Sequence, residues 1–250
     1  MNFIELKSLV IRAAVAASLS AVFVGSSFAG ENVEQKIKEA VESNTAGKVS
    51  VSAVAKSPIP GIYEITSGTD IFYVDSTGRY GFVDGRLVDM KESKDLTALR
   101  LEKLTSINFK ELPLELAIKT VQGNGKRVIA VFEDPACPIC VALHKFLAQI
   151  PDATVYTFMY PVVSPDSIPK AQAAWCSSDR AKAWSTLMQG GQAAGSKPCD
   201  TTGLSRIAAL GDKLNIAGTP TVFLSDGRRL VGATPPDQLM AAIDEAARKK

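Results

Sequence analysis

The chain has 250 residues, of which 46% are hydrophobic, 22% charged and 7% aromatic. This composition excludes intrinsic disorder, a collagen-like repeat and a small disulfide-stapled scaffold. The formal net charge is only +2, with no basic stripe, so nucleic acid is not expected as a partner. The length predicts two domains, each with enough apolar residues for a core of its own.

The N-terminus has the pattern of a secretory signal peptide. Lys7 and Arg12 precede the uncharged run 13–24, which falls short of the about 20 residues that a spanning helix needs. Small residues up to Ala29 then fit a cleavage site. We expect residues 1–29 to be removed on export to an oxidising compartment, the periplasm for a bacterial signal of this kind. The alternative is an uncleaved N-terminal anchor.

Residues 30–91 are predicted to form a small domain that is mainly antiparallel β-sheet. Its expected elements are a helix over 31–43 and short strands over 49–55, 62–65, 71–74, 79–83 and 86–90. A module of about 60 residues is marginally stable alone, so self-association is expected. The apolar side chains around Tyr80 and Phe82 could bind peptides, or could serve as core and dimer contacts.

A charged segment with an imperfect leucine stripe predicts a linker helix over residues 92–107. Beyond residue 125 the pattern changes to α/β. The expected strands are 128–132, 154–163, 221–224 and 229–231, and the expected helices are 138–149, 170–177, 179–189, 203–214 and 236–248.

The strongest chemical signal is Cys137-Pro138-Ile139-Cys140, placed where a buried strand turns into a helix. This spacing brings both sulfur atoms to one side of the first helical turn, close enough for a disulfide. At the helix N-cap, free N–H groups and the helix dipole favour the Cys137 thiolate, which makes Cys137 the expected nucleophile. Cys140 is the expected resolving thiol, which releases a mixed disulfide.

The four cysteines allow other arrangements. A zinc knuckle would need Cys176, Cys199 or the single histidine as further ligands, and none lies in a second metal-binding motif. A static disulfide within the CxxC motif would restrain little of the unfolded chain. Pairing Cys176 with Cys199 would instead stabilise the fold by about 3.5 kcal/mol, so a structural disulfide is expected there. A second redox pair is the alternative.

Three polar residues near the motif have two readings each. Glu133 and Asp134 could shuttle protons to the cysteines, although a solvated or turn-capping role is the plainer expectation. His144 follows Cys140 by one helical turn and could influence it, or could be an ordinary half-buried helix residue. By itself, Pro220 is an ordinary proline at the start of a strand.

Taken together, these residues resemble the DsbC/DsbG family of periplasmic thiol:disulfide isomerases. The matching features, in chain order, are the signal peptide, the small β domain, the linker helix, the FEDPACPIC segment at 132–140, Trp175-Cys176, Cys199, the AGTPTVFLSDG segment at 217–227 and Pro235-Pro236. The resemblance extends over essentially all of the mature chain.

The resemblance implies an α+β and α/β architecture, with a thioredoxin-like catalytic domain over 108–250 and an N-terminal dimerisation domain over 30–91. It also implies a homodimer, misfolded disulfide-containing exported proteins as substrates and a DsbD-like membrane reductase as electron donor. Pro220 is then expected to be cis and to lie against Cys137, with Thr219 offering backbone hydrogen bonds to substrate. No cofactor or metal is implied.

Two features depart from the family pattern. The central dipeptide Pro138-Ile139 is neither the Gly-Tyr typical of DsbC nor the Pro-Tyr typical of DsbG. Val131 stands where thioredoxin carries a buried acid. The prediction is a disulfide isomerase or reductase. The alternatives are a DsbG-like reductase of sulfenylated cysteines and a thiol-independent periplasmic chaperone.

Overall fold

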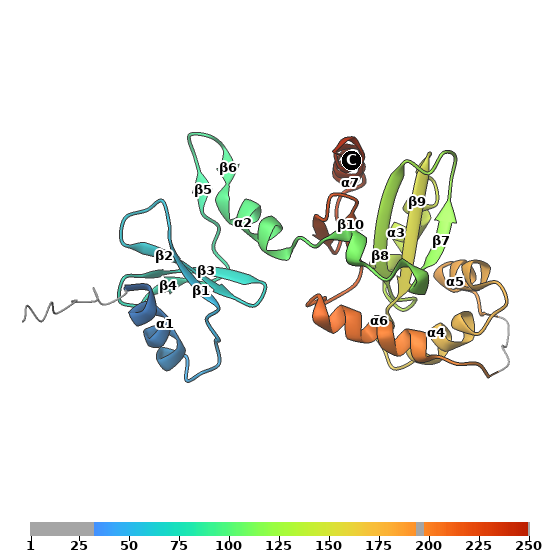
Figure 1. The fold of residues 1–250 in the computed structure, drawn as a ribbon, viewed down its shortest axis with the longest axis horizontal. Helices are drawn as coiled ribbons and strands as arrows, with labels where there is room; N and C mark the ends of the chain where they lie inside the picture. The colour runs from blue at the N-terminus through green and yellow to red at the C-terminus, as the bar shows by residue number, and fades with distance from the viewer. Residues whose placement is uncertain (1–32, 194–197, 250) are drawn as a thin grey trace, which may run out of the picture.

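The computed structural model describes residues 33–193 and 198–249, and the expected signal peptide lies outside these residues. Figure 1 shows two lobes joined by the segment that contains α2 (Leu96–Thr105). None of the helices in the described part of the chain has the length and apolarity that a bilayer crossing requires.

The N-terminal lobe packs α1 (Val33–Asn44) against an antiparallel sheet with strand order β1-β2-β3-β4. The strands are β1 (Ala53–Lys56), β2 (Ile62–Ser67), β3 (Asp70–Asp75) and β4 (Gly81–Phe82). Their shared core consists of Ile37, Val41, Val51, Ile65 and Val74. This lobe has the small antiparallel architecture that its sequence predicts.

The first strand is shorter than expected, because the side chain of Glu42 binds the backbone where a strand would continue. The N–H of Val51 donates to Glu42 Oε1 at 2.9 Å, so β1 begins only at Ala53. At the other end of the sheet, β4 is the last strand, and its outer edge has no strand partner among the described residues.

The connection between the lobes begins with a two-stranded hairpin, β5 (Val88–Asp89) and β6 (Lys94–Asp95). Helix α2 follows, inside the expected linker segment 92–107. Asp95 starts the helix, because its carboxylate accepts a hydrogen bond from the Ala98 N–H at 2.7 Å. Two short 3-10 helices, Phe109–Glu111 and Leu114–Leu116, lead into the second lobe.

The second lobe is built on a five-stranded sheet of order β11-β10-β8-β9-β7, in which only β8 and β9 run parallel. Its strands are β7 (Ile118–Val121), β8 (Arg127–Glu133), β9 (Ala153–Met159), β10 (Thr221–Leu224) and β11 (Arg229–Val231). Its helices are α3 (Pro138–Leu147), α4 (Ser167–Trp175), α5 (Arg180–Met188), α6 (Thr202–Lys213) and α7 (Pro236–Arg248).

The buried strand β8 divides the core of this lobe into two. Ile129 and Val131 belong to the cluster that also contains residues of α3 and α7, whereas Ala130 and Phe132 belong to the cluster with α4, α5 and α6. Successive side chains of a strand point to opposite faces. By this alternation, Glu133 at the end of β8 lies on the face of Ile129 and Val131, toward α3.

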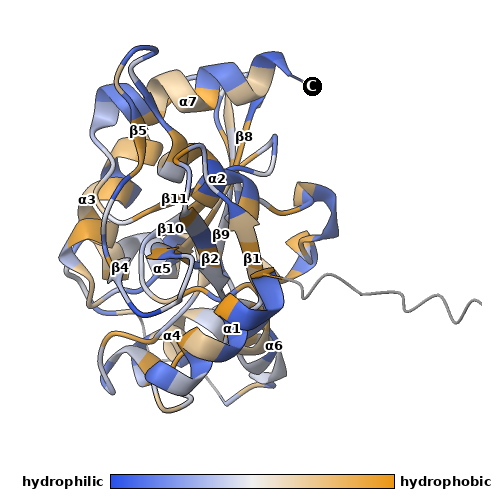
Figure 2. Cartoon of the chain, turned by 90° about the vertical axis from the view of Figure 1, so that its left-hand side faces the viewer, coloured by the Kyte–Doolittle hydropathy of each residue, from blue (hydrophilic) through white to orange (hydrophobic). Residues whose placement is uncertain are grey.

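Each lobe has an amphipathic helix that covers part of its core, α1 in the first lobe and α7 in the second. Figure 2 shows hydrophilic and hydrophobic residues together on α1 and on α7. The buried residues recur at a spacing of one helical turn, with Ile37 and Val41 in α1 and Leu239 and Ile243 in α7. Each helix therefore turns one apolar stripe to its sheet and leaves the polar face outside.

Candidate active site at the start of helix α3

The two cysteines of the CxxC motif lie at the end of β8, where a short turn enters α3. Cys137 is the N-cap of this helix, with an extended backbone, and Pro138 occupies the first helical turn. The N–H of Cys140 donates to Cys137 Sγ at 3.3 Å. The sequence predicted this placement, and the hydrogen bond favours a negative charge on the Cys137 sulfur.

The two thiols differ in exposure. Cys137 keeps 6% of its surface accessible, whereas Cys140 has none. Burial raises the pKa of the Cys140 thiol well above its ordinary value, and the Asp134 backbone N–H and the Thr219 side chain oppose this shift only in part. Cys140 is therefore held as a protonated thiol behind the more accessible Cys137.

The loop before β10 lies against Cys137. The Thr219-Pro220 peptide bond is cis, and the Cys137 thiol donates to the carbonyl oxygen of Thr219 at 3.4 Å. The Gly232 N–H donates to the Pro220 carbonyl at 2.9 Å, which ties this loop to the segment before α7. The structure thus brings Thr219 and Pro220 to the CxxC motif, as expected from the resemblance.

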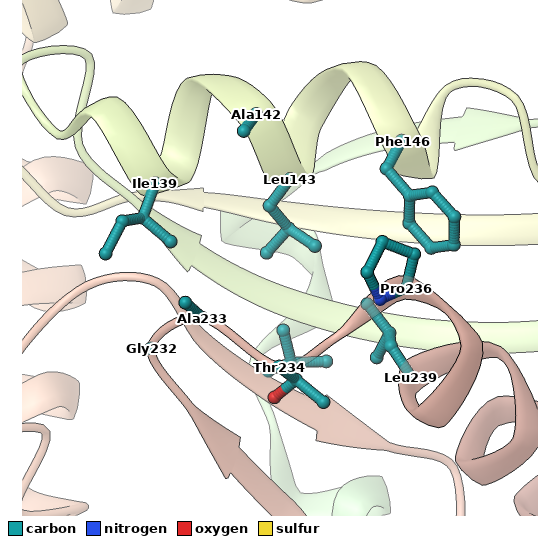
Figure 3. Close-up of a pocket in the computed structure, with 10 residues that line it drawn as sticks. Ile139, Ala142, Leu143, Phe146, Gly232, Ala233, Thr234, Pro236 and Leu239 are labelled. Atoms are coloured by element: carbon teal, nitrogen blue, oxygen red, sulfur yellow. The ribbon is translucent and has the colours of Figure 1, made fainter.

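An apolar groove of about 180 Å³ runs beside the motif (Figure 3). One wall comes from α3, with Ile139 of the CxxC motif at its end, and the opposite wall comes from the segment 232–239. Ile139 is 43% exposed although it is hydrophobic. The groove therefore offers an apolar surface directly next to the dithiol.

The buried carboxylate of Asp134 holds the turn that carries Cys137 through four hydrogen bonds. Its Oδ1 accepts hydrogen bonds from the Ala136 N–H and the Ser167 hydroxyl, both at 2.7 Å. Its Oδ2 accepts from the N–H groups of Val162 and Val163 at 2.7 and 2.8 Å. Asp134 is turn-capping, as the sequence suggests, but fully buried and not solvated.

Glu133 differs from the sequence-based expectation, because it is neither solvated nor part of a cap. Its side chain is fully buried and its Oε2 lies 3.0 Å from His144 Nδ1. The same oxygen accepts a hydrogen bond from Trp184 Nε1 at 3.2 Å. No sequence signal pointed to Trp184, since helix α5 lies far along the chain. His144 is half-buried, with 20% of its side chain exposed.

The remaining two cysteines form a disulfide, Cys176–Cys199, at the end of α4. Trp175 supports this region, because its Nε1 donates to the Asp200 carbonyl at 3.0 Å and the Arg180 guanidinium stacks 3.8 Å from its ring centre. A zinc knuckle thus loses Cys176 and Cys199 as possible further ligands. Within residues 33–193 and 198–249, no group of three or more His, Cys, Asp or Glu side chains is placed to hold a metal ion.

Comparison with known proteins assigns both lobes. Residues 114–247 match the thioredoxin-like domain family, and residues 26–98 match the N-terminal domain family of disulfide bond isomerase proteins. The probable thiol:disulfide interchange protein DsbC of Bordetella pertussis is 44% identical over 193 residues, which are 77% of this chain and 68% of that protein. The chain belongs to the DsbC family.

One further protein relative and one solved structure support the same assignment. The thiol:disulfide interchange protein DsbC of Escherichia coli is 27% identical over 213 residues, 83% of this chain and 88% of that protein. The crystal structure of a disulfide interchange protein from Neisseria gonorrhoeae superposes with a TM-score of 0.51 and 40% identity, covering 54% of this chain and 99% of that one.

Membership in the DsbC family establishes the activity, which is thiol–disulfide interchange of the disulfide isomerase type, and the thioredoxin-like α+β fold. It also supports disulfide-containing substrates and a homodimer. DsbC family members are periplasmic. The DsbG-like reductase and the thiol-independent chaperone are not favoured by these comparisons.

Proposed function

We propose that Cys137 and Cys140 perform the interchange reaction in this chain, with Cys137 as the nucleophile. The observation that carries this proposal is the position of Cys137 at the N-cap of α3, with the Cys140 N–H on its sulfur. Thiolates rather than thiols attack disulfides, and N–H donors at a helix start stabilise a thiolate.

The isomerase cycle needs only these sulfurs and those of the substrate. The Cys137 thiolate attacks one sulfur of a wrong disulfide, which breaks the S–S bond and releases the other sulfur as a thiolate. A different substrate thiolate then attacks the mixed disulfide and displaces Cys137. The substrate disulfide is rearranged, and Cys137 returns as a thiolate with no net oxidation or reduction.

A second branch reduces the substrate. If Cys140 attacks the mixed disulfide, its S–H proton is lost, the substrate leaves as a thiolate and a Cys137–Cys140 disulfide forms. Two electrons and two protons are then needed to restore the dithiol. We propose a DsbD-like membrane reductase as the donor, on the basis of the family resemblance.

Substrate binding is proposed for the cis-proline loop. The Thr219 carbonyl already takes a hydrogen bond from the Cys137 thiol, and the Thr219-Pro220 backbone flanks the position at which a substrate sulfur must approach. The apolar groove that ends at Ile139 would accommodate an apolar side chain near the substrate cysteine (Figure 3).

The proposed domain organisation follows the expected boundaries: a signal peptide over 1–29, a dimerisation domain over 30–91, a linker helix over 92–107 and a catalytic domain over 108–250. The open edge of β4 supports dimerisation, because the exposed Phe82 on this strand and its neighbours Tyr80 and Val83 would bury apolar surface against a second copy. Export to the periplasm is proposed from the signal pattern. The Cys176–Cys199 pair is proposed as a structural disulfide.

Refolding of a scrambled multi-disulfide protein tests the roles of the two cysteines. Cys137→Ala should abolish the recovery of native protein, because no nucleophile remains. Cys140→Ala should keep isomerisation but lose net reduction, because another substrate thiol can still release the mixed disulfide. Equal recovery with the native protein and Cys137→Ala would refute the proposal.

A further inference from the structure

The carboxylate of Glu133 is buried without a full set of partners. Oε2 accepts two hydrogen bonds, from His144 and Trp184, whereas Oε1 has no partner among the described residues. A buried polar atom without a partner costs free energy, and a buried carboxylate costs more. Such a group is a candidate for function when a reactive centre lies beside it.

The Glu133–His144 pair is close to Cys140 along the chain, because His144 shares a face of α3 with Cys140 and Glu133 directly precedes Asp134. Glu133 lies on the face of β8 that meets α3, and His144 follows Cys140 on α3 by one turn, so their side chains are neighbours on the helix surface. On the other side, the backbone N–H of Asp134, the residue after Glu133, acts on the Cys140 sulfur. The pair is therefore connected to Cys140 through one turn of α3 on one side and through the backbone of Asp134 on the other.

Asp134, the other buried acid near the dithiol, is not suited to take up a proton. Its two carboxylate oxygens accept four hydrogen bonds from three N–H groups and one hydroxyl. Both oxygens of Asp134 are therefore already occupied as acceptors. Among the described residues, Glu133 Oε1 has no partner, so a proton can be accommodated there.

We propose that the Glu133–His144 pair takes the proton that Cys140 loses when it attacks the mixed disulfide. This inference rests on the proposed roles of Cys137 and Cys140. The S–H bond of Cys140 breaks as its sulfur bonds to Cys137 Sγ, the bond between Cys137 and the substrate breaks, and the substrate leaves as a thiolate. The proton from the Cys140 S–H bond passes to Glu133 Oε1, the carboxylate oxygen without a partner among the described residues, while Oε2 keeps its contact with His144.

The surroundings allow the proton to leave again. His144 lines a cavity of about 120 Å³ together with the polar side chains of Thr120, Gln122, Thr157 and Ser185. The titratable group in contact with the Glu133 carboxylate among the described residues is His144 of α3. Helix α5 contributes the Trp184 N–H, and the neighbouring strand β9 places Met159 opposite Glu133.

Reaction of the reduced protein with 5,5′-dithiobis(2-nitrobenzoate) tests the proposal, because it separates the two thiols in one trace. Attack by Cys137 releases the first thionitrobenzoate, and attack by Cys140 on the resulting mixed disulfide releases the second. Glu133→Gln should slow the second phase by about tenfold or more at pH 7, as expected for loss of a proton acceptor, and leave the first phase within about twofold. His144→Gln should act in the same direction.

The pH profile distinguishes proton transfer from a packing effect. In Glu133→Gln the second phase should regain rate with rising pH more steeply than in the native protein, because hydroxide then replaces the missing acceptor. Trp184→Phe is the matched control, since it removes a hydrogen bond to the same carboxylate oxygen and no titratable group. Both of its phases should stay within about twofold of the native rates.

The outcomes separate this inference from the proposed function. An unchanged second phase in either the Glu133 or the His144 variant overturns the pair, and equal slowing in Trp184→Phe does so too. If Glu133→Gln does not fold, as judged by thermal unfolding, His144→Gln decides. A native protein that lacks a first fast phase would instead refute the role of Cys137.

Discussion

The thiol of Cys137 lies 3.4 Å from the carbonyl oxygen of Thr219, although 82 positions separate the two residues. The antiparallel pairing of β8 with β10, which sets Phe132 opposite Thr221, produces this proximity. The nucleophile and the cis-proline loop thus extend from the ends of two adjacent strands. A substrate that approaches the sulfur must meet the backbone of Thr219 and Pro220.

The raised pKa of Cys140 predicts its alkylation behaviour. Because burial keeps this thiol protonated, its thiolate fraction is small at neutral pH and grows by about tenfold per pH unit. In Cys137→Ala, the rate of reaction with iodoacetamide should rise by about tenfold for each pH unit from about pH 7 to 9. The rate should not level off near pH 8.5, as it does for an ordinary thiol. The same variant unfolded in urea serves as the control. A plateau in the folded variant would contradict the prediction.

Asp134→Ala should destabilise the fold strongly. The substitution leaves four donors without their acceptor, including the buried Ser167 hydroxyl, and an unsatisfied buried donor costs about 1–3 kcal/mol. Urea unfolding followed by circular dichroism measures the loss. Asp166→Ala is the control, because Asp166 is exposed and its side chain makes no capping bond to α4, so the change should stay within about 0.5 kcal/mol. Equal losses of unfolding free energy in both variants would refute a stabilising role for the Asp134 hydrogen bonds.

Replacing both Cys176 and Cys199 by Ala should lower the free energy of unfolding by about 3 kcal/mol, since the disulfide no longer restricts the unfolded chain. Neither residue lines the groove beside the CxxC motif. Interchange by the folded double variant should therefore equal that of the native protein. Loss of activity at unchanged stability would indicate a second redox pair instead.

Phe82→Asp should weaken the homodimer. Phe82 is 65% exposed on the open edge strand β4, where a charge opposes strand pairing and burial in an interface. Sedimentation velocity at micromolar concentration should show more monomer than the native protein. Val121→Asp is the matched control, because Val121 is 56% exposed on β7, an edge strand of the other lobe. A dimer unaffected by Phe82→Asp would place the interface elsewhere.

Most of the fold could be predicted from the sequence, because its elements carry strong local signals. The helix over 138–149 and the strand over 128–132 agree with α3 and β8 to within two residues at each end. Strand β7 was not predicted, because three of its four residues are exposed and no clear alternation marks it. It exists through pairing with β9, a contact between segments about 35 positions apart.

The part of the candidate site that depends on neighbouring residues could also be predicted from the sequence. A CxxC motif between a buried strand and a helix, a proline in the first turn and the cysteine spacing all act within one or two turns of chain. Glu133 was expected in solvent or in a cap, and the structure buries it. The reason lies in β8, whose alternation turns Glu133 toward α3, where its carboxylate contacts His144 of α3 and Trp184 of α5.

The sequence by itself determined where the dithiol lies, which cysteine caps the helix and which family the chain resembles, because capping, spacing and periodicity are short-range properties of the chain. The position of Thr219 beside Cys137 was expected only through the family resemblance. The tertiary structure alone decided that Asp134 accepts four hydrogen bonds and that Glu133 is buried with no partner for Oε1 among the described residues. Those facts depend on which strands and helices pack together, and burial and hydrogen-bond partners arise only when distant segments exclude water from each other.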